Sequence, residues 1–254
     1  MRILLVNPNT TASMTTLIES AAQSVAGPAT TISARTSRMG PVSIEGYYDE
    51  VFAVPGMLIE IAEGERAGAD AAIIACFDDT GLDAARAMAS IPVLGICEAA
   101  VATAATVAQR FSVVTTLERS IMPVKGLMHR YGMSDRATVR AADIPVLSLD
   151  DPSSGALTKL RIEIERALTD DQAEAIVLGC AGMADLARQL QDEYGVPVVD
   201  GVSAAVKLAE GLVALGLRTS KRGAYATPLA KPYMGILASF APQSPKNNSV
   251  WTET

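Results

Sequence analysis

Short apolar runs alternate with amphipathic stretches along most of the chain. The first run, Arg2-Ile-Leu-Leu-Val6, ends at Asn7-Pro8, where proline disfavours continuation of a strand. The residues that follow are apolar at helical spacing as far as about residue 26. Buried strands that alternate with helices predict parallel sheets connected by right-handed crossovers. We therefore expect an α/β fold.

The same pattern predicts the other elements. Strands are expected at 30–34, 92–96, 111–116, within 143–152, at 196–199, and in the apolar segments before Cys76 and Cys180. Helices are expected at about 50–68 with a break at Pro55-Gly56, and at 98–109, 118–131, 153–168 and 202–215. Residues 35–49 are rich in Gly, Pro and Ser, which indicates a loop.

The two cysteine segments form an internal repeat. Cys76 and Cys180 each follow an apolar segment and precede a helical pattern. At nearly the same offset, Ile91-Pro-Val-Leu94 matches Val196-Pro-Val-Val199. The repeat predicts two pseudo-symmetric, flavodoxin-like lobes: residues 1–104 with about 216–240, and residues 105–215, followed by a loose tail at 241–254. Because ligands of such folds bind at the carboxyl ends of strands, both thiols are expected in a cleft between the lobes.

Composition excludes several classes of function. The net charge of −7 disfavours nucleic acid and acidic membrane surfaces as partners. No apolar run approaches the roughly 20 residues of a membrane span. His129 is the only histidine, which disfavours a histidine-centred metal site or a serine triad. Three cysteines, with no signal-peptide pattern at the N-terminus, predict free thiols in a reducing cytoplasm.

Two thiols that face one carbon atom can invert its configuration. A thiolate removes a proton from one side, and a thiol returns a proton from the other, so neither a cofactor nor a metal is required. A helix N-terminus stabilises a thiolate, and both Cys76 and Cys180 are expected just before helices. Cys97 lacks a counterpart in the second repeat, where Val202 stands, and is expected to be a core residue.

Several ordered motifs resemble the hydantoin racemase branch of the aspartate/glutamate racemase superfamily. They are Val6-Asn-Pro-Asn-Thr10, Ser43-Ile-Glu-Gly46, Ile74-Ala-Cys-Phe-Asp-Asp79 and Ile176-Val-Leu-Gly-Cys-Ala-Gly182, within a resemblance that covers residues 1 to about 230. The histidine that follows the second cysteine in glutamate racemases is absent here, where Ala181-Gly182-Met183 follow Cys180. Allantoin racemases share much of this pattern, and allantoin is itself a 5-substituted hydantoin.

The resemblance implies a cofactor-independent racemase, a homo-oligomer, with a small-molecule substrate. Cys76 and Cys180 would act on opposite faces of the hydantoin C5 atom. The family pattern would also place around the ring Asn9, the backbone of Phe77 and Asp78, Thr116, Ala181 and Gly182. Each of these polar residues also has a purely structural alternative. Asn9 and Thr116 could instead cap helices. Asp78 and Asp79 could instead lie in the first turn of the helix that follows Cys76.

Other functions remain open at this point. Malonate decarboxylases of the same scaffold typically keep one of the two cysteines, and maleate isomerases form an adduct with one thiol. A two-lobed binding protein would leave both thiols without a role. A thiol redox enzyme would favour a C-x-x-C motif, but Cys76 and Cys180 are far apart in the sequence. A nucleotide-binding module would favour a glycine-rich phosphate loop, and the sequence contains neither a G-x-G-x-x-G nor a Walker motif. The paired thiols favour the racemase.

Overall fold

The computed structural model describes residues 1–150 and 152–243. Its strands form two four-stranded parallel sheets, with the orders β2-β1-β3-β4 and β6-β5-β7-β8. The predicted α/β fold with two parallel sheets is confirmed. The strands are β1 (Arg2–Asn7), β2 (Thr31–Thr36), β3 (Ala71–Ile74), β4 (Val93–Gly95), β5 (Phe111–Thr115), β6 (Ala137–Ala141), β7 (Ala175–Gly179) and β8 (Val198–Asp200).

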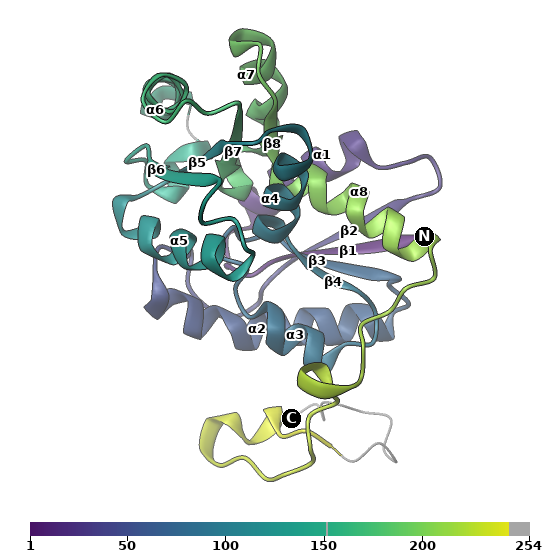
Figure 1. Cartoon of the computed structure of the whole chain (residues 1–254). Helices are drawn as coiled ribbons and strands as arrows, with labels where there is room; N and C mark the ends of the chain where they lie inside the picture. Colours follow the sequence, from purple (N-terminus) through teal and green to yellow (C-terminus); the bar gives the residue numbers. More distant parts are fainter. Residues whose placement is uncertain (151, 244–254) are drawn as a thin grey trace.

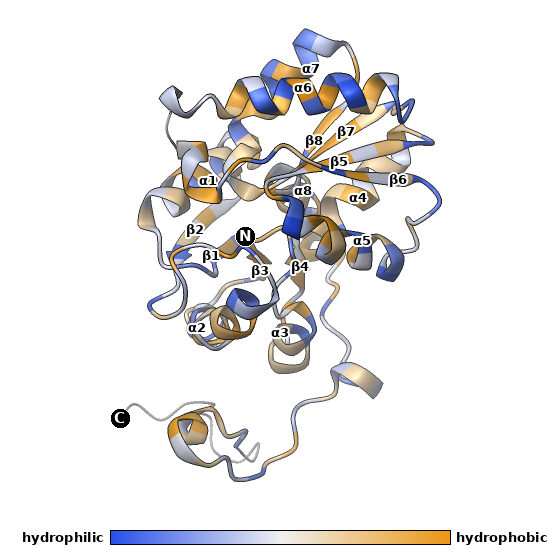
Figure 2. Ribbon diagram, turned by 90° about the vertical axis from the view of Figure 1, so that its left-hand side faces the viewer, coloured by the Kyte–Doolittle hydropathy of each residue, from blue (hydrophilic) through white to orange (hydrophobic). Residues whose placement is uncertain are grey.

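Helices cover both faces of both sheets, so that the molecule is built in alternating layers (Figures 1 and 2). α2 and α3 lie on the outer face of the first sheet, α6 and α7 on the outer face of the second, and α1, α4, α5 and α8 between the sheets. The helices are α1 (Ala12–Val25), α2 (Tyr47–Arg66), α3 (Leu82–Met88), α4 (Ile96–Val107), α5 (Ile121–Arg130), α6 (Ala156–Thr169), α7 (Ala187–Tyr194) and α8 (Gly201–Ala214).

The two sheets place the two cysteines in equivalent positions. β3 and β7 each lie third in their sheet, next to the strand that opens the repeat. Cys76 follows the end of β3 by two residues, and Cys180 comes directly after β7. The repeat seen in the sequence therefore corresponds to a repeat in topology.

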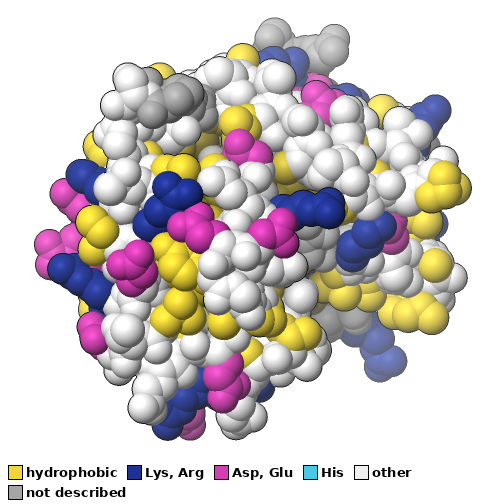
Figure 3. All heavy atoms as spheres, turned by 90° about the horizontal axis from the view of Figure 1, so that it is seen from above, with side chains coloured by type: hydrophobic (Ala, Val, Ile, Leu, Met, Phe, Trp, Pro, Cys, Tyr) yellow, Lys and Arg dark blue, Asp and Glu magenta, His cyan; other side chains and the backbone are white. Residues whose placement is uncertain are grey.

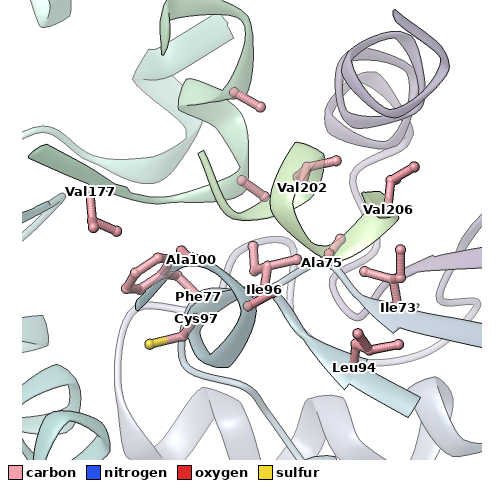
Figure 4. Packing of buried hydrophobic residues seen from close by; sticks show 14 of the residues in the cluster. Ile73, Ala75, Phe77, Leu94, Ile96, Cys97, Ala100, Val177, Val202 and Val206 are labelled. Atoms are coloured by element: carbon pink, nitrogen blue, oxygen red, sulfur yellow. The ribbon is translucent and has the colours of Figure 1, made fainter. Parts of the chain in front are cut away.

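One apolar core joins the sheets. It contains the inner faces of both sheets and the facing sides of α4 and α8. Figure 4 shows Ile96 and Val202, near the starts of α4 and α8, within this core, together with Phe77, Cys97 and Ala100. Cys97 is fully buried, as expected for a core cysteine. We propose that the lobes divide near residue 105. With this boundary, α4 of the first lobe packs against β7 of the second, and α8 of the second lobe packs against β3 of the first. These contacts tie the two lobes together.

Two predicted elements differ from the structure. The strand expected within 143–152 lies earlier, at β6, and residues 146–150 form a 3-10 turn instead. β6 is an edge strand in which Arg140 binds Asp171 at 2.5 and 2.7 Å, so its apolar signal is weak. The break expected at Pro55-Gly56 is absent, because α2 runs unbroken through Pro55. The carbonyl that Pro55 leaves without a donor belongs to Val51, a residue that is 64% exposed.

The chain after α8 returns to the first sheet. The Thr219 hydroxyl donates to the Ile91 carbonyl at 2.6 Å, and the Lys221 ammonium to the Arg86 carbonyl at 2.7 Å. Short 3-10 turns follow at 223–225 and 235–240. Of the expected tail at 241–254, residues 244–254 lie outside the described part.

The surface carries charges of both signs. On the face seen from above in Figure 3, Lys and Arg side chains lie among Asp and Glu side chains. Within residues 1–150 and 152–243, every helix is too short or too polar to cross a bilayer.

Candidate active site

Both repeat cysteines line one cavity between the two sheets. Its volume is about 40 Å³, which is room for a few water molecules. Both halves of the chain contribute to it. The lining residues are Asn7, Pro8, Asn9, Met14, Ile44, Ala75, Cys76, Phe77, Asp78, Thr115, Thr116, Ser120, Val146, Gly179, Cys180 and Ala181.

Of the residues predicted to act on the substrate or to surround its ring, all but Gly182 line this cavity. Gly182 lies next to it, since a Cβ atom at this position would come 3.8 Å from the Cys180 sulfur and 3.1 Å from Leu149 Cδ1. The convergence of two thiols 104 positions apart is thus a feature of the folded chain.

The environment of Cys76 raises the pKa of its thiol well above the usual value. Burial is the main cause, and the nearby Asp78 carboxylate adds to it. Two donors act in the opposite direction: the Thr80 hydroxyl, 3.3 Å from the sulfur, and the Asp78 backbone N–H. The expectation that a helix N-terminus would lower this pKa is wrong, because α3 begins only at Leu82, beyond a turn. At neutral pH Cys76 therefore rests as the thiol, because its pKa is raised.

Thr80→Val is expected to raise the pKa of Cys76 further, because it removes a hydroxyl that stabilises the thiolate. A hydrogen bond worth about 1 kcal/mol corresponds to roughly a fivefold smaller thiolate fraction at a given pH below the pKa. The measurement is the rate of Cys76 alkylation by iodoacetamide against pH, followed by peptide mass spectrometry. The variant's curve should shift to higher pH. Thr103→Val, which removes a hydroxyl on α4 bonded to Ala99, is the control. Superimposable curves for Thr80→Val and wild type would refute this role.

Cys180 is held by a close approach between two strands. A Cβ atom on Gly179 would lie 2.8 Å from Thr115 Cα and 2.9 Å from the Val114 carbonyl oxygen, so only glycine lets β7 come this near to β5. Cys180 is then the N-cap of a 3-10 helix at 181–186. The first N–H groups of a helix lack intrahelical acceptors, so those of Ala181 and Gly182 can serve an oxygen atom in the cavity.

Asn9 belongs to a small amide network at the end of β1. Its side-chain oxygen accepts from the Asn7 amide at 2.9 Å and from the Thr11 N–H at 2.9 Å. Its own amide nitrogen lies 3.5 Å from the Met14 sulfur, a weak acceptor. Thr11, rather than Asn9, is the N-cap residue of α1. The network fixes an Asn9 amide group that can donate to a carbonyl oxygen in the cavity.

The two acidic residues after Cys76 have different positions. Asp78 lines the cavity, and burial together with the Glu50 and Asp79 charges raises its pKa to about 7. Asp79 turns away and accepts from the backbone N–H groups of Cys97 at 3.0 Å and Glu98 at 2.9 Å. The alternative that placed both acids in the first helical turn after Cys76 is wrong, because that helix begins at Leu82. Asp79 instead caps α4.

Asp79 also links the two halves of the chain. The Tyr131 hydroxyl, at the end of α5, donates to its carboxylate at 2.6 Å. Asp79 has a left-handed backbone with φ of 48°, and burial raises its pKa to about 7. The turn that carries Cys76 is therefore fixed to α4 and to α5.

Tyr131→Phe is expected to lower the free energy of unfolding by about 1–3 kcal/mol, because it removes one partner of a buried carboxyl group. Tyr225→Phe is the matched control, since the Tyr225 hydroxyl also binds an aspartate, Asp83, but at the exposed surface. Tyr225→Phe should lower the free energy of unfolding by less than about 0.5 kcal/mol. Urea unfolding followed by circular dichroism measures both. Equal losses in the two variants would contradict a special role for the link between Asp79 and Tyr131.

Several lining residues were not foreseen from the sequence. Ile44 and Val146 come from loops of the two halves that meet over the cavity, where the Val146 N–H donates to Glu45 at 3.0 Å. Ser120 and Met14 come from the starts of α5 and α1. Of these four residues, only Ile44 lay in a motif already noted. Within residues 1–150 and 152–243, there is no group of three or more His, Cys, Asp or Glu side chains arranged to hold a metal ion.

Comparisons with known proteins agree over nearly the whole chain. A family model described as Asp/Glu/Hydantoin racemase matches residues 3–209. A hydantoin racemase from Rhizobium meliloti is 51% identical over 236 residues, which is 92% of this chain and 98% of that protein. A hydantoin racemase from Pseudomonas sp. (strain NS671) is 49% identical over 242 residues, 94% of this chain and 97% of that protein. The solved structure of an allantoin racemase from Klebsiella pneumoniae has a TM-score of 0.92 at 49% identity, covering 96% of this chain and 100% of that one.

Proposed function

The chain belongs to the Asp/Glu/hydantoin racemase family, and we propose that it racemises 5-monosubstituted hydantoins with Cys76 and Cys180 as its two acid–base groups. The chain is a racemase, an isomerase, on the strength of its identity to hydantoin racemases over most of its length. The observation that carries the two-thiol mechanism is that both cysteines, from equivalent strand ends, line one cavity.

The reaction needs two proton transfers at C5. The thiolate of one cysteine takes the C5 proton, which forms an S–H bond and leaves the electron pair on the ring as an enolate. The thiol of the other cysteine then gives its proton to the opposite face of C5 and becomes the thiolate. The inverted product leaves an enzyme whose proton has moved from one sulfur to the other, ready for the opposite enantiomer.

The cavity offers partners for a neutral ring. The adjacent carbonyl acidifies the C5 proton, and the enolate oxygen gains charge as that proton leaves. The N–H groups of Ala181 and Gly182 and the Asn9 amide can donate to ring carbonyl oxygens. Phe77, which is 4% exposed and lines the cavity, provides an apolar surface beside the ring. Because the cavity has a volume of only about 40 Å³, it has to widen to admit a hydantoin ring.

A single enantiomer of 5-benzylhydantoin in deuterated water tests the proposal. Optical rotation is expected to decay to zero without added cofactor, while NMR shows deuterium entering C5 at a comparable rate. A purified enzyme that gave neither inversion nor exchange on 5-benzylhydantoin, 5-isopropylhydantoin and allantoin would refute the function.

Allantoin is the second candidate substrate, because the allantoin racemase structure matches 96% of this chain at 49% identity. It is a hydantoin with a ureido group at C5, so the same two thiols could act on it. The values of kcat/KM for 5-benzylhydantoin and allantoin, measured side by side, decide between an apolar and a ureido substituent.

A further inference from the structure

Glu50, in the first turn of α2, carries a buried carboxyl oxygen without a partner. Within residues 1–150 and 152–243, its Oε1 atom is the single buried side-chain nitrogen or oxygen that lacks a hydrogen bond. Burial raises the pKa of this carboxyl. Buried polar atoms are nearly always paired, so an orphaned oxygen points to a function or to strain. The acid–base chemistry of the two thiols leaves Glu50 without a role.

Glu50 lies on the face of α2 that packs against the turn between β3 and α3, which carries Cys76. Residues spaced four and seven apart share one face of a helix, so Glu50, Val54 and Met57 form one row along α2. The last two contact the turn, since a Cβ atom on Gly81 would lie 3.0 Å from Val54 Cγ2 and 2.7 Å from Met57 Cε. The Glu50 carboxyl therefore belongs to the surroundings of this turn.

Asp78 connects Glu50 to the thiol electrostatically. It stands two positions after Cys76, both residues line the cavity, and its backbone N–H donates to the Cys76 sulfur. Three influences on its carboxyl all disfavour the charged form: burial, the Glu50 charge and the Asp79 charge. They raise its pKa to about 7, so both protonation states of Asp78 occur near neutral pH.

Other groups also face the Cys76 thiol. The Thr80 hydroxyl donates to the sulfur at 3.3 Å, and Cys180 lines the same cavity from the end of β7. Asp79 is held by the N–H groups at the start of α4 and by the Tyr131 hydroxyl of the second half. Of the charges that raise the pKa of the thiol, that of Asp78 has the largest effect.

We propose that Asp78 controls the formation of the Cys76 thiolate by gaining or losing a proton, and that Glu50 is a positioning residue that keeps this proton on Asp78. When Asp78 is neutral, the sulfur ionises without a second negative charge beside it. When Asp78 is charged, the two anions repel each other, because like charges sharing one site disfavour joint ionisation. Glu50 therefore favours the thiolate, although it is itself an acid.

The proposed racemisation needs the neutral form of Asp78. Its negative charge resides first on a thiolate and then on the ring enolate, and a carboxylate in the same small cavity opposes both. This consequence rests on the proposed function. The control of the thiol does not, since it concerns the protein alone.

The pH profile of Cys76 alkylation by iodoacetamide tests the proposal on the full chain without a substrate. Peptide mass spectrometry separates Cys76 from the other two thiols. In wild type, the logarithm of the rate should rise with pH, flatten just above pH 7 as Asp78 ionises, and then rise again. The flat part spans about one pH unit if the Asp78 charge lowers the thiolate fraction about tenfold. An uninterrupted rise would overturn the proposal.

Two amide substitutions should change the profile in opposite directions. Asp78→Asn removes the charge beside the sulfur, so its rate should match wild type at pH 6 and exceed it about tenfold at pH 9. Glu50→Gln lets Asp78 ionise at lower pH, so its rate should be about threefold below wild type at pH 7 and equal to it at pH 9. The double variant should follow Asp78→Asn, because Glu50 acts only through Asp78.

Asp49→Asn is the matched control, because Asp49 is an acid of the same helical turn whose carboxylate accepts from the Glu45 N–H at 3.0 Å. Its profile should match wild type. The role of Glu50 is overturned if Glu50→Gln also matches wild type, if both amide variants shift in one direction, or if the double variant departs from Asp78→Asn. A protein that shows the expected profiles but leaves hydantoins unchanged would refute the function and not the control of the thiol.

Discussion

Replacing either Cys76 or Cys180 with serine is expected to abolish racemisation, with kcat/KM falling by about 10²–10⁴-fold or more. A serine hydroxyl keeps the shape of the thiol but is a far weaker acid, so it neither forms the base nor readily gives up its proton. Each variant retains one sulfur on one side of the cavity. That sulfur can still remove the proton of the enantiomer that presents C5–H to it.

Deuterium exchange distinguishes the two sides. In deuterated water, Cys180→Ser should exchange the C5 proton of one enantiomer without inverting it, because the proton leaves and deuterium returns at the same sulfur. Cys76→Ser should do the same with the opposite enantiomer. NMR of C5 and optical rotation report the two events separately. Exchange of the same enantiomer by both variants would contradict a two-sided mechanism.

Cys97→Ala is the matched control for these variants. Cys97 is fully buried in the core between the sheets, and its backbone N–H, rather than its sulfur, binds Asp79. The substitution removes a buried sulfur, which costs stability, but leaves the cavity unchanged. It should therefore lower the thermal midpoint and keep racemisation within a few-fold of wild type. If racemisation were lost with Cys97 and kept without Cys180, the assignment of the thiols would be wrong.

The internal repeat explains why the fold and the thiols could be read from the sequence. Strands buried on both faces, such as Ala71–Ile74 and Ala175–Gly179, are continuous apolar runs bounded by turns. Because the two strands match, Cys76 and Cys180 were expected at the carboxyl ends of equivalent strands in the two sheets. The roles of these residues in the reaction stay predictions, which the cysteine variants test.

What the sequence concealed depends on tertiary contacts. β6 carries Arg140, whose charge is paired in the folded chain with the carboxylates of Asp171, Asp170 and Glu163. Ile44 and Val146 reach the cavity from loops whose approach is set by the packing of the two halves. The pKa of Cys76 depends on burial, which overrides the local turn. None of these contacts is encoded in a local spacing.

Gly201→Ala is expected to lower the free energy of unfolding by about 3 kcal/mol, at the upper end of the range for overpacked cores. A Cβ atom at this position would lie 2.4 Å from the Ile96 carbonyl oxygen, 2.9 Å from Ile96 Cβ and 3.0 Å from the Ile96 carbonyl carbon. These are atoms at the start of α4, most of them backbone, so the clash cannot be relieved by turning a flexible side chain. α4 and α8 must move apart, and with them the core that joins the two sheets. The thermal midpoint should fall by about 5–10 °C.

Gly211→Ala is the matched control, because it makes the same change in the same helix. A Cβ atom at Gly211 meets nothing within 4 Å, and alanine is a better helix former than glycine by about 1 kcal/mol. This variant should therefore gain up to about 1 kcal/mol of stability where Gly201→Ala loses it. Differential scanning calorimetry on the three proteins measures the contrast. If both variants raised the midpoint, helix propensity would outweigh the crossing of α4 and α8, and the close approach at Ile96 would not be what holds the two sheets together.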